Sequence, residues 1–193
     1  MTEQSLSVRD AIIQRRSIKL FNGELVDRDT LVSIMEDALW APNHQMRQPW
    51  RFIAACGEEG LTELHELLKE FGIPKWKELS EDALEKQMQK FKNPGAYLFV
   101  IVPEDARQKE RLEDYAAASM LVQNIQLLAW EKGIGSCWKT PGFLDNPKFR
   151  EALGVQSGER IISMFQVGYF NEAPQPKPRK SIDEVVTFFG NQK

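Results

Sequence analysis

The sequence predicts an α+β fold of a three-layer α/β/α kind, with a central mixed sheet flanked by helices. One observation is that short apolar runs, typical of buried strands, alternate with segments of helical periodicity. The clearest run, 97–102, is apolar throughout, as expected for a strand buried on both faces. A second is that 193 residues, 42% hydrophobic and 27% charged, suffice for one domain with a sizeable core. The other expected strands are 51–56, 134–140 and 161–168.

Capping residues and chain breakers define where the helices begin and end. The longest helix is expected over 105–132, and its part 116–130 is apolar on nearly all sides. Such a helix lies at the centre of a fold or in a dimer interface. The segment 74–93 is charged, contains one capped helix, and leaves open whether it forms a lid. The predicted N-caps are Ser7, Asp27 or Asp29, Ser80 and Asn146.

The C-terminal part of the chain differs from the rest in composition. Three prolines fall within 173–178, which predicts an extended arm rather than packed core. We interpret this arm as reaching across to a second subunit. The sequence therefore predicts a single domain over 1–193, with 171–193 as its extended C-terminal arm.

Composition excludes several classes of function. The net charge of −3 argues against a general binder of nucleic acid or of membrane surfaces. Cys56 and Cys137 lie far apart in apolar runs and are expected to be free thiols, which suits the cytoplasm. With only His44 and His65 besides, no metal site is expected, and His65 is expected at the surface. Neither a signal peptide nor a membrane-spanning stretch is predicted.

A basic stretch at 15–19, Arg-Arg-Ser-Ile-Lys, is the first candidate for binding. Its three cations and one hydroxyl are embedded among apolar residues, unlike a solvated charge run. Arginine binds a phosphate through two parallel hydrogen bonds, serine adds a hydroxyl donor, and lysine adds a point charge. Taken alone, however, the stretch is better interpreted as a helix end whose cations complement the helix dipole.

Three further stretches join the basic one. They are Trp-Ala-Pro-Asn-His-Gln-Met-Arg-Gln-Pro-Trp at 40–50, Gly-Ile-Gly-Ser-Cys-Trp-Lys-Thr-Pro-Gly-Phe at 133–143 and Pro-Arg-Lys at 178–180. The sequence contains no nucleophile elbow, P-loop, dinucleotide-binding glycine motif or zinc-protease motif. In their order and spacing, the four stretches resemble the nitroreductase family of FMN-dependent oxidoreductases, from about residue 7 to about 190.

The resemblance implies a role for each stretch. The basic stretch would grip the phosphate and ribityl chain of FMN, with Lys19 at the pyrimidine end of the ring. The loop 42–48 would reach the flavin from the partner subunit, 138–140 would lie beside the ring, and Arg179 would close over the phosphate. The implied cofactor-binding residues are Arg15, Arg16, Ser17, Lys19, Pro42, Asn43, His44, Gln48, Trp138, Lys139, Thr140 and Arg179.

The resemblance also implies an activity. A homodimer with noncovalent FMN at its interface would use NAD(P)H to reduce nitroaromatic, quinone or similar flat acceptors. The reaction would be ping-pong hydride transfer through flavin N5, with no protein side chain as the catalytic group. Two alternatives stay open: a flavin enzyme of the same fold that dehalogenates or reduces enones, and a non-enzymatic FMN-binding protein. The chain departs from many relatives at 43–45 and 140–142, which leaves its substrate and hydride donor open.

Overall fold

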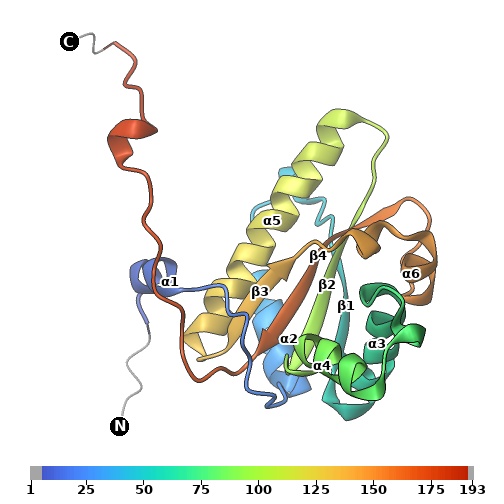
Figure 1. Cartoon of the computed structure of the whole chain (residues 1–193). Coiled ribbons are helices and arrows are strands. Elements are labelled where there is room, and N and C mark those ends of the chain that lie inside the picture. The colour runs from blue at the N-terminus through green and yellow to red at the C-terminus, as the bar shows by residue number, and fades with distance from the viewer. Residues whose placement is uncertain (1–5, 191–193) are drawn as a thin grey trace.

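A computed structural model describes residues 6–190 (Figure 1), so 1–5 and 191–193 of the predicted domain lie outside the described residues. The helices are α1 (Val8–Gln14), α2 (Arg28–Ala38), α3 (Gly57–Gly72), α4 (Glu81–Lys92), α5 (Gln108–Glu131) and α6 (Pro147–Ala152). The strands are β1 (Arg51–Cys56), β2 (Ala96–Pro103), β3 (Gly135–Lys139) and β4 (Glu159–Gly168). Short 3₁₀ turns are η1 (His44–Met46), η2 (Trp76–Glu78), η3 (Gly142–Asp145) and η4 (Ile182–Glu184).

The predicted caps begin the helices where the sequence indicated. The Ser7 side chain accepts the N–H of Asp10 at 3.1 Å, and Asp27, rather than Asp29, accepts the N–H of Thr30 at 2.8 Å. The Ser80 and Asn146 side chains cap α4 and α6 in the same way. Each cap satisfies a backbone donor that the first helical turn leaves unpaired. The charged segment 74–93 is therefore mostly ordered as η2 and α4.

The strands form one sheet in the order β1-β2-β4-β3, and all three strand pairs are antiparallel. The α+β class is confirmed. The parallel pairing that a mixed sheet requires is limited, in residues 6–190, to an isolated bridge between Ser17 and Ser136. The alternation of helices and strands suggested more parallel pairing. However, α3 and α4 return the chain to the end at which β1 finishes, where Ala96 pairs with Cys56, so that β2 runs antiparallel to β1 (Figure 1).

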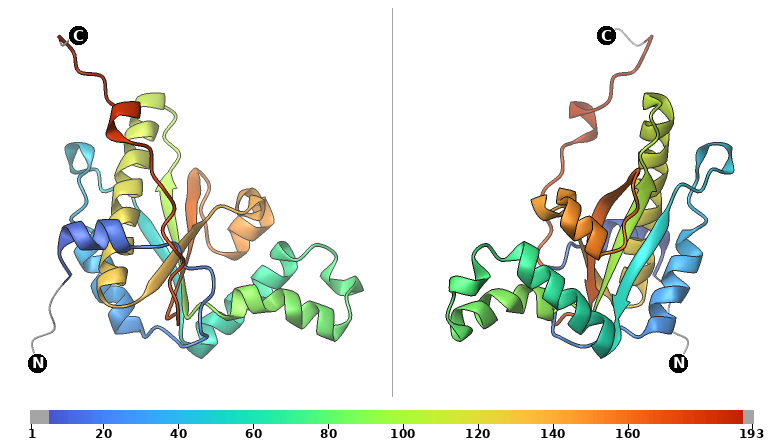
Figure 2. Two further views of the ribbon diagram at one scale, coloured as in Figure 1. Left: turned by 60° about the vertical axis from the view of Figure 1, so that its left-hand side comes forward. Right: turned by 90° about the vertical axis from the view of Figure 1, so that its right-hand side faces the viewer.

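Two apolar cores cover the two faces of the sheet and make three layers (Figure 2). Leu98 and Val100 of β2 face α2 and α5, whereas Tyr97, Phe99 and Ile101 face α3, α4 and α6. This alternation follows from the period of two along a strand, and it explains why β2 is apolar at every position. No helix among residues 6–190 combines the length and the apolar character needed to cross a membrane.

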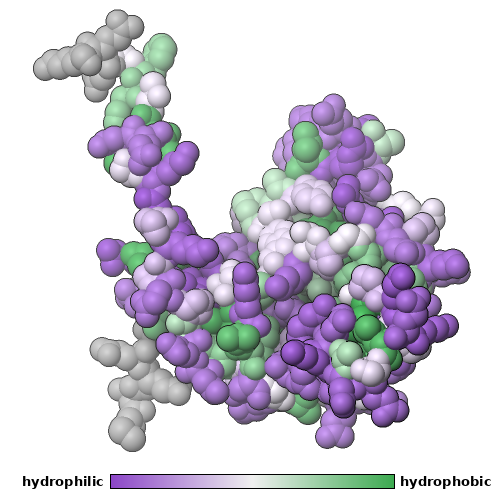
Figure 3. All heavy atoms as spheres, in the orientation of Figure 1, coloured by the Kyte–Doolittle hydropathy of each residue, from purple (hydrophilic) through white to green (hydrophobic). Residues whose placement is uncertain are grey.

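The C-terminal segment leaves the body of the protein after β4 (Figure 1). From 171 to 181 it has no helix or strand, as the prolines predicted. It then exposes large apolar side chains, visible in Figure 3 as green spheres that stand away from the body. These side chains are Ile182, Val185, Phe188 and Phe189. An arm with this character suits an exchange between subunits, which stays a prediction.

Candidate functional site

The basic stretch runs from the end of α1 along the edge strand β3. Arg15 leaves the helical conformation, and the N–H of Ile18 donates to the Ser136 carbonyl at 3.0 Å. The buried Ile18 side chain fits against Gly135, where an added Cβ would lie 2.5 Å from the Ile18 Cγ1 atom. Glycine at 135 therefore permits this close approach. Because Ile18 is buried, its neighbours Ser17 and Lys19 are turned toward solvent.

Three arginines meet beside β3, and no acidic residue among 6–190 pairs with them. The Nε and Nη1 atoms of Arg15 are buried and have no hydrogen-bond partner among residues 6–190. Burial, followed by the charges of Arg16 and Arg179, lowers the pKa of Arg15. Arg16 donates to the carbonyls of Ile13 at 2.7 Å and of Arg15 at 2.9 Å, and Arg179 donates to that of Lys177 at 2.9 Å. The structure thus brings Arg15, Arg16 and Arg179 together, an arrangement whose chemistry suits a strongly negative group.

The other end of β3 borders a hollow of about 440 Å³. The predicted residues Lys19, Lys139 and Thr140 line it together. Its apolar walls are supplied by residues of α4, η3 and β4, chiefly Phe91, Phe143 and Met164. A volume of this size is within the range of small-molecule sites. The sheet edge therefore connects the arginine cluster to a partly apolar hollow that has lysines at its rim.

Trp138 and Lys139 point to opposite faces of the sheet. Trp138 pairs with Phe165 and packs against the core beneath α2 and α5. Lys139 pairs with Met164 and borders the hollow on the other face. Adjacent residues of a strand alternate between faces, so only one of the two can line the hollow. The sequence pattern had grouped them as one segment beside the ring.

The loop 42–48 has a tight, locally bonded conformation. The Asn43 side chain accepts the Gln48 N–H at 2.9 Å and donates to the Ala41 carbonyl at 3.3 Å. Gln45, Met46 and Gln48 all have positive φ values, which nonglycine residues rarely adopt. The predicted site residues Pro42, His44 and Gln48 are exposed.

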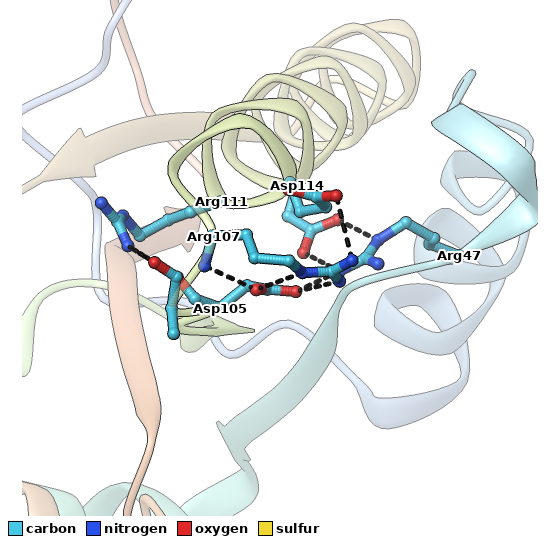
Figure 4. Close-up of polar contacts among 7 residues, drawn as sticks. Arg47, Asp105, Arg107, Arg111 and Asp114 are labelled. Carbon is cyan, nitrogen blue, oxygen red and sulfur yellow. Dashed lines mark hydrogen bonds and ion pairs between the residues drawn. The ribbon is translucent and has the colours of Figure 1, made fainter.

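Arg47 fastens this loop to α5 (Figure 4). Its guanidinium donates to both oxygens of the buried Asp114, at 2.8 and 2.7 Å, and to Asp105 at 3.3 Å. These bonds raise the pKa of Arg47. Hydrogen bonds from Arg107 and, less strongly, from Arg47 hold the pKa of Asp105 well below its usual range. The strained loop conformation is thus maintained by a bidentate ion pair beneath it.

Within one chain, the predicted site residues fall into two separate groups. Asp114, under the loop 42–48, and Trp130, which packs beside Ile18 and Cys137, are sixteen residues apart on α5. At 1.5 Å per residue this is about 24 Å along the helix axis. The basic stretch and Arg179 therefore lie near one end of α5, and the loop lies near the other (Figure 1). Lys139 and Thr140 belong with the basic stretch, because they share the hollow with Lys19.

Several site residues were missed from the sequence. Lys90 and Gln166 border the hollow, and Arg47 with Asp114 holds the loop. Gln166 had a detectable signal, since it is, with Ser163, a polar residue within the largely apolar run 161–168. No comparable signal marked Lys90, because a lysine in a charged helix is ordinarily expected to be a solvated surface residue.

The three layers, the arginine cluster and the hollow define a class: an α+β protein with a strongly cationic sheet edge. The family model described as "Nitroreductase family" matches residues 12–169, and the chain belongs to that family. YfhC of Bacillus subtilis (strain 168), provisionally named an NAD(P)H nitroreductase, is 40% identical over 185 residues, which cover 93% of each protein.

Solved structures agree with this assignment. A nitroreductase-like family protein from Bacillus cereus is 36% identical, with a TM-score of 0.87 over 99% of this chain and 100% of that one. The nitroreductase NfnB from Sphigopyxis sp. strain HMH, described as FMN- and NADPH-dependent, is 22% identical. Its TM-score is 0.75 over 96% of this chain and 100% of that one, a likeness that shows the fold.

Proposed function

We propose that this protein is an FMN-dependent oxidoreductase that uses NAD(P)H to reduce nitroaromatic, quinone or similar flat acceptors. The observation that carries the proposal is the guanidinium of Arg15, which lies between two further arginines and whose buried Nε and Nη1 donors have no partner among the described residues. Unpaired buried donors are rare in folded proteins because their desolvation is costly. A dianionic phosphate would satisfy them with charge-assisted, bidentate hydrogen bonds. The names of YfhC and NfnB support the proposal.

The remaining residues at this sheet edge suit the rest of the cofactor. Ser17 can donate to the ribityl chain, and Lys19, Lys139 and Thr140 border the hollow that would receive the ring. Trp138 would support the strand from the opposite face. When bound, FMN supplies the transfer of electrons from NAD(P)H to the acceptor. The cationic side chains would bind the phosphate and stabilise negative charge on the reduced ring. Neither role requires a side chain that acts as a general acid or base.

We further propose that a homodimer completes each site. The loop 42–48 would contribute Pro42, Asn43, His44 and Gln48 to the site of the partner, since it lies far from the basic stretch of its own chain. Exposed apolar side chains of α1, such as Val8 and Ile12, and those of the arm 171–193 would be covered in this dimer.

The test begins with the purified protein and its flavin spectrum. FMN should copurify or bind on addition, and NADH or NADPH should bleach its absorbance under anaerobic conditions. Steady-state assays with nitroaromatics, quinones and halophenols then identify the acceptor class. Bound FMN that neither nucleotide reduces would favour the non-enzymatic alternative, and a protein that binds no FMN would contradict both.

A further inference from the structure

Lys90 adds a third cation to the hollow beside β3. It comes from α4, whereas Lys19 comes from the basic stretch and Lys139 from β3. No aspartate or glutamate borders this hollow among residues 6–190. Three unneutralised cations around one hollow are notable in a chain whose net charge is −3. By contrast Lys92, two residues further along α4, pairs with Glu85 at 2.5 Å.

The backbone that carries Lys90 is fixed to the sheet by a buried hydrogen-bond network. The Gln166 side-chain amide donates to the Lys90 carbonyl at 3.3 Å and to the Tyr97 hydroxyl at 3.1 Å. The Tyr97 hydroxyl in turn donates to the Phe91 carbonyl at 2.9 Å. Tyr97 and Gln166 are both buried. The end of α4 is therefore held at the wall of the hollow, which limits where the Lys90 side chain can reach.

The Lys90 ammonium is available to an incoming ligand. Its Nζ atom lies 4.8 Å from the ring centroid of Phe91, and no carboxylate among the described residues pairs with it. Phe91 and Phe143 supply the apolar walls that a flat ring requires. Lys19 and Lys139 are already assigned to the cofactor, so Lys90 is the cation left for a second molecule.

We propose that Lys90 binds the carboxylate of a flat, single-ring aromatic acceptor, so that the hollow selects anionic over neutral acceptors. This inference rests on the proposed function, because the acceptor would share the hollow with the cofactor. A nicotinamide nucleotide also carries anionic groups. We assign Lys90 to the acceptor because its ammonium lies beside the aromatic walls, where the ring of a benzoate would place its acid group.

The experiment compares the FMN-loaded wild type with Lys90→Gln and with the matched control Lys86→Gln. Lys86 is an exposed lysine on the same helix that does not border the hollow. The probes are 4-nitrobenzoate and the neutral, nearly isosteric 4-nitrobenzamide. Calorimetry measures the Kd of each probe for the oxidised protein, and stopped flow follows oxidation of the reduced protein by each probe.

In Lys90→Gln, the Kd for 4-nitrobenzoate should rise about tenfold, the effect of losing one charge-assisted hydrogen bond. The Kd for the amide should change less than about twofold. Lys90→Arg should retain the preference for the anion, and Lys86→Gln should behave as wild type. In Lys86→Gln, anaerobic reduction of the flavin by NADPH should also be unchanged.

Three results would overturn the inference. The first is an unchanged Kd for 4-nitrobenzoate in Lys90→Gln. The second is an equal rise of that Kd in Lys86→Gln. The third is slower reduction of Lys90→Gln by NADPH with unaltered binding of 4-nitrobenzoate. Failure of the proposed function gives a different result, because the wild type would then carry no FMN, or would carry FMN that neither NADH nor NADPH reduces. Calorimetry decides the matter even if 4-nitrobenzoate is bound without being reduced.

Discussion

At the scale of single residues, Arg15 has the least favourable surroundings in the described chain without a ligand. Its guanidinium is half-buried, its Nε and Nη1 donors are unpaired, and two further arginines lie near it. Evolution toward stability alone would favour an uncharged side chain here. The arrangement makes sense if a phosphate, absent from the free chain, neutralises the cluster.

Arg15→Gln should therefore weaken FMN binding without unfolding the protein. We expect the Kd for FMN to rise at least about tenfold, as charge-assisted hydrogen bonds to the phosphate are lost. FMN fluorescence quenching measures the Kd, and the exposed Arg9→Gln on α1 is the matched control. FMN should raise the melting temperature of the control but not that of the variant. Wild-type affinity in Arg15→Gln would show that the phosphate lies elsewhere.

His65 provides a second prediction at this scale. The sequence predicted a surface position, but the side chain is half-buried and Nε2 lies 2.9 Å from the Phe91 carbonyl. The neighbours on α4 enclose the ring because α3 packs against α4, which sequence periodicity did not reveal. Burial is the main cause that lowers the pKa of His65 below its ordinary value of 6.5.

The unfolded chain therefore binds the His65 proton more readily than the folded chain. Stability should fall as the pH decreases through about 6.5, because protonation then favours the unfolded state. Urea denaturation at pH 7.5 and 5.5 measures this loss, which should be smaller in His65→Gln. An equal loss in both proteins would assign the pH dependence to other groups.

At the scale of elements, the ion pair between Arg47 and Asp114 connects the loop 42–48 to α5. The two residues are 67 positions apart, and Asp114 is 1% exposed. Three residues of the loop have positive φ values, so the loop needs such an external restraint. The pKa of Asp105 is held well below its usual range, so its contacts with Arg107 and Arg47 should persist in mild acid, where His65 already titrates.

Asp114→Asn should loosen the loop while leaving the sheet intact. Removing one carboxylate charge weakens the bidentate pair with Arg47, and the strained backbone should then open more often. Hydrogen exchange at 43–48 should increase, and the affinity for FMN should fall if the loop completes a site. The control is Glu113→Gln, one residue away on α5. Unchanged exchange in Asp114→Asn would mean that Asn43 alone maintains the loop.

At the scale of the whole molecule, the two groups of site residues lie near opposite ends of α5. A chain cannot bring them together without unfolding a helix of 24 residues. Two chains in a symmetric dimer can, because each then presents its loop to the basic stretch of the other. The exposed apolar side chains of α1 and of the arm provide surface for this contact.

Mixing two defective variants tests the shared site. One chain carries Arg15→Gln and Arg16→Gln, and the other carries Asn43→Ala and His44→Ala. If sites are shared, heterodimers contain one intact site, and about a quarter of all sites should regain tight FMN binding. The matched control mixes Arg15→Gln with Arg16→Gln, which can produce no intact site. Recovery in neither mixture would contradict a site built from two subunits.

The sequence by itself determined the helices and strands, and it singled out the basic stretch 15–19 as a candidate part of the site. Caps such as Ser7 and Asp27 begin helices through bonds that span three residues, so neighbouring residues are sufficient to predict them. Strands were recognisable because burial on both faces requires apolar side chains at every position. The basic stretch was noticed by its residue types, whereas Lys139 and Thr140 entered through the family resemblance, and their binding of the cofactor stays a prediction.

Only the tertiary structure decided which distant residues meet. The antiparallel direction of the strands, the hollow that joins Lys90 to Lys139, and the pair of Arg47 with Asp114 depend on contacts between separate elements. Trp138 and Lys139 lie on opposite faces of β3, because side chains alternate along a strand. Which face meets the core and which meets the hollow is decided by how the helices pack on the sheet. The physical reason is the same throughout: local sequence sets backbone preferences, whereas the long-range burial of apolar surface determines which side chains become neighbours.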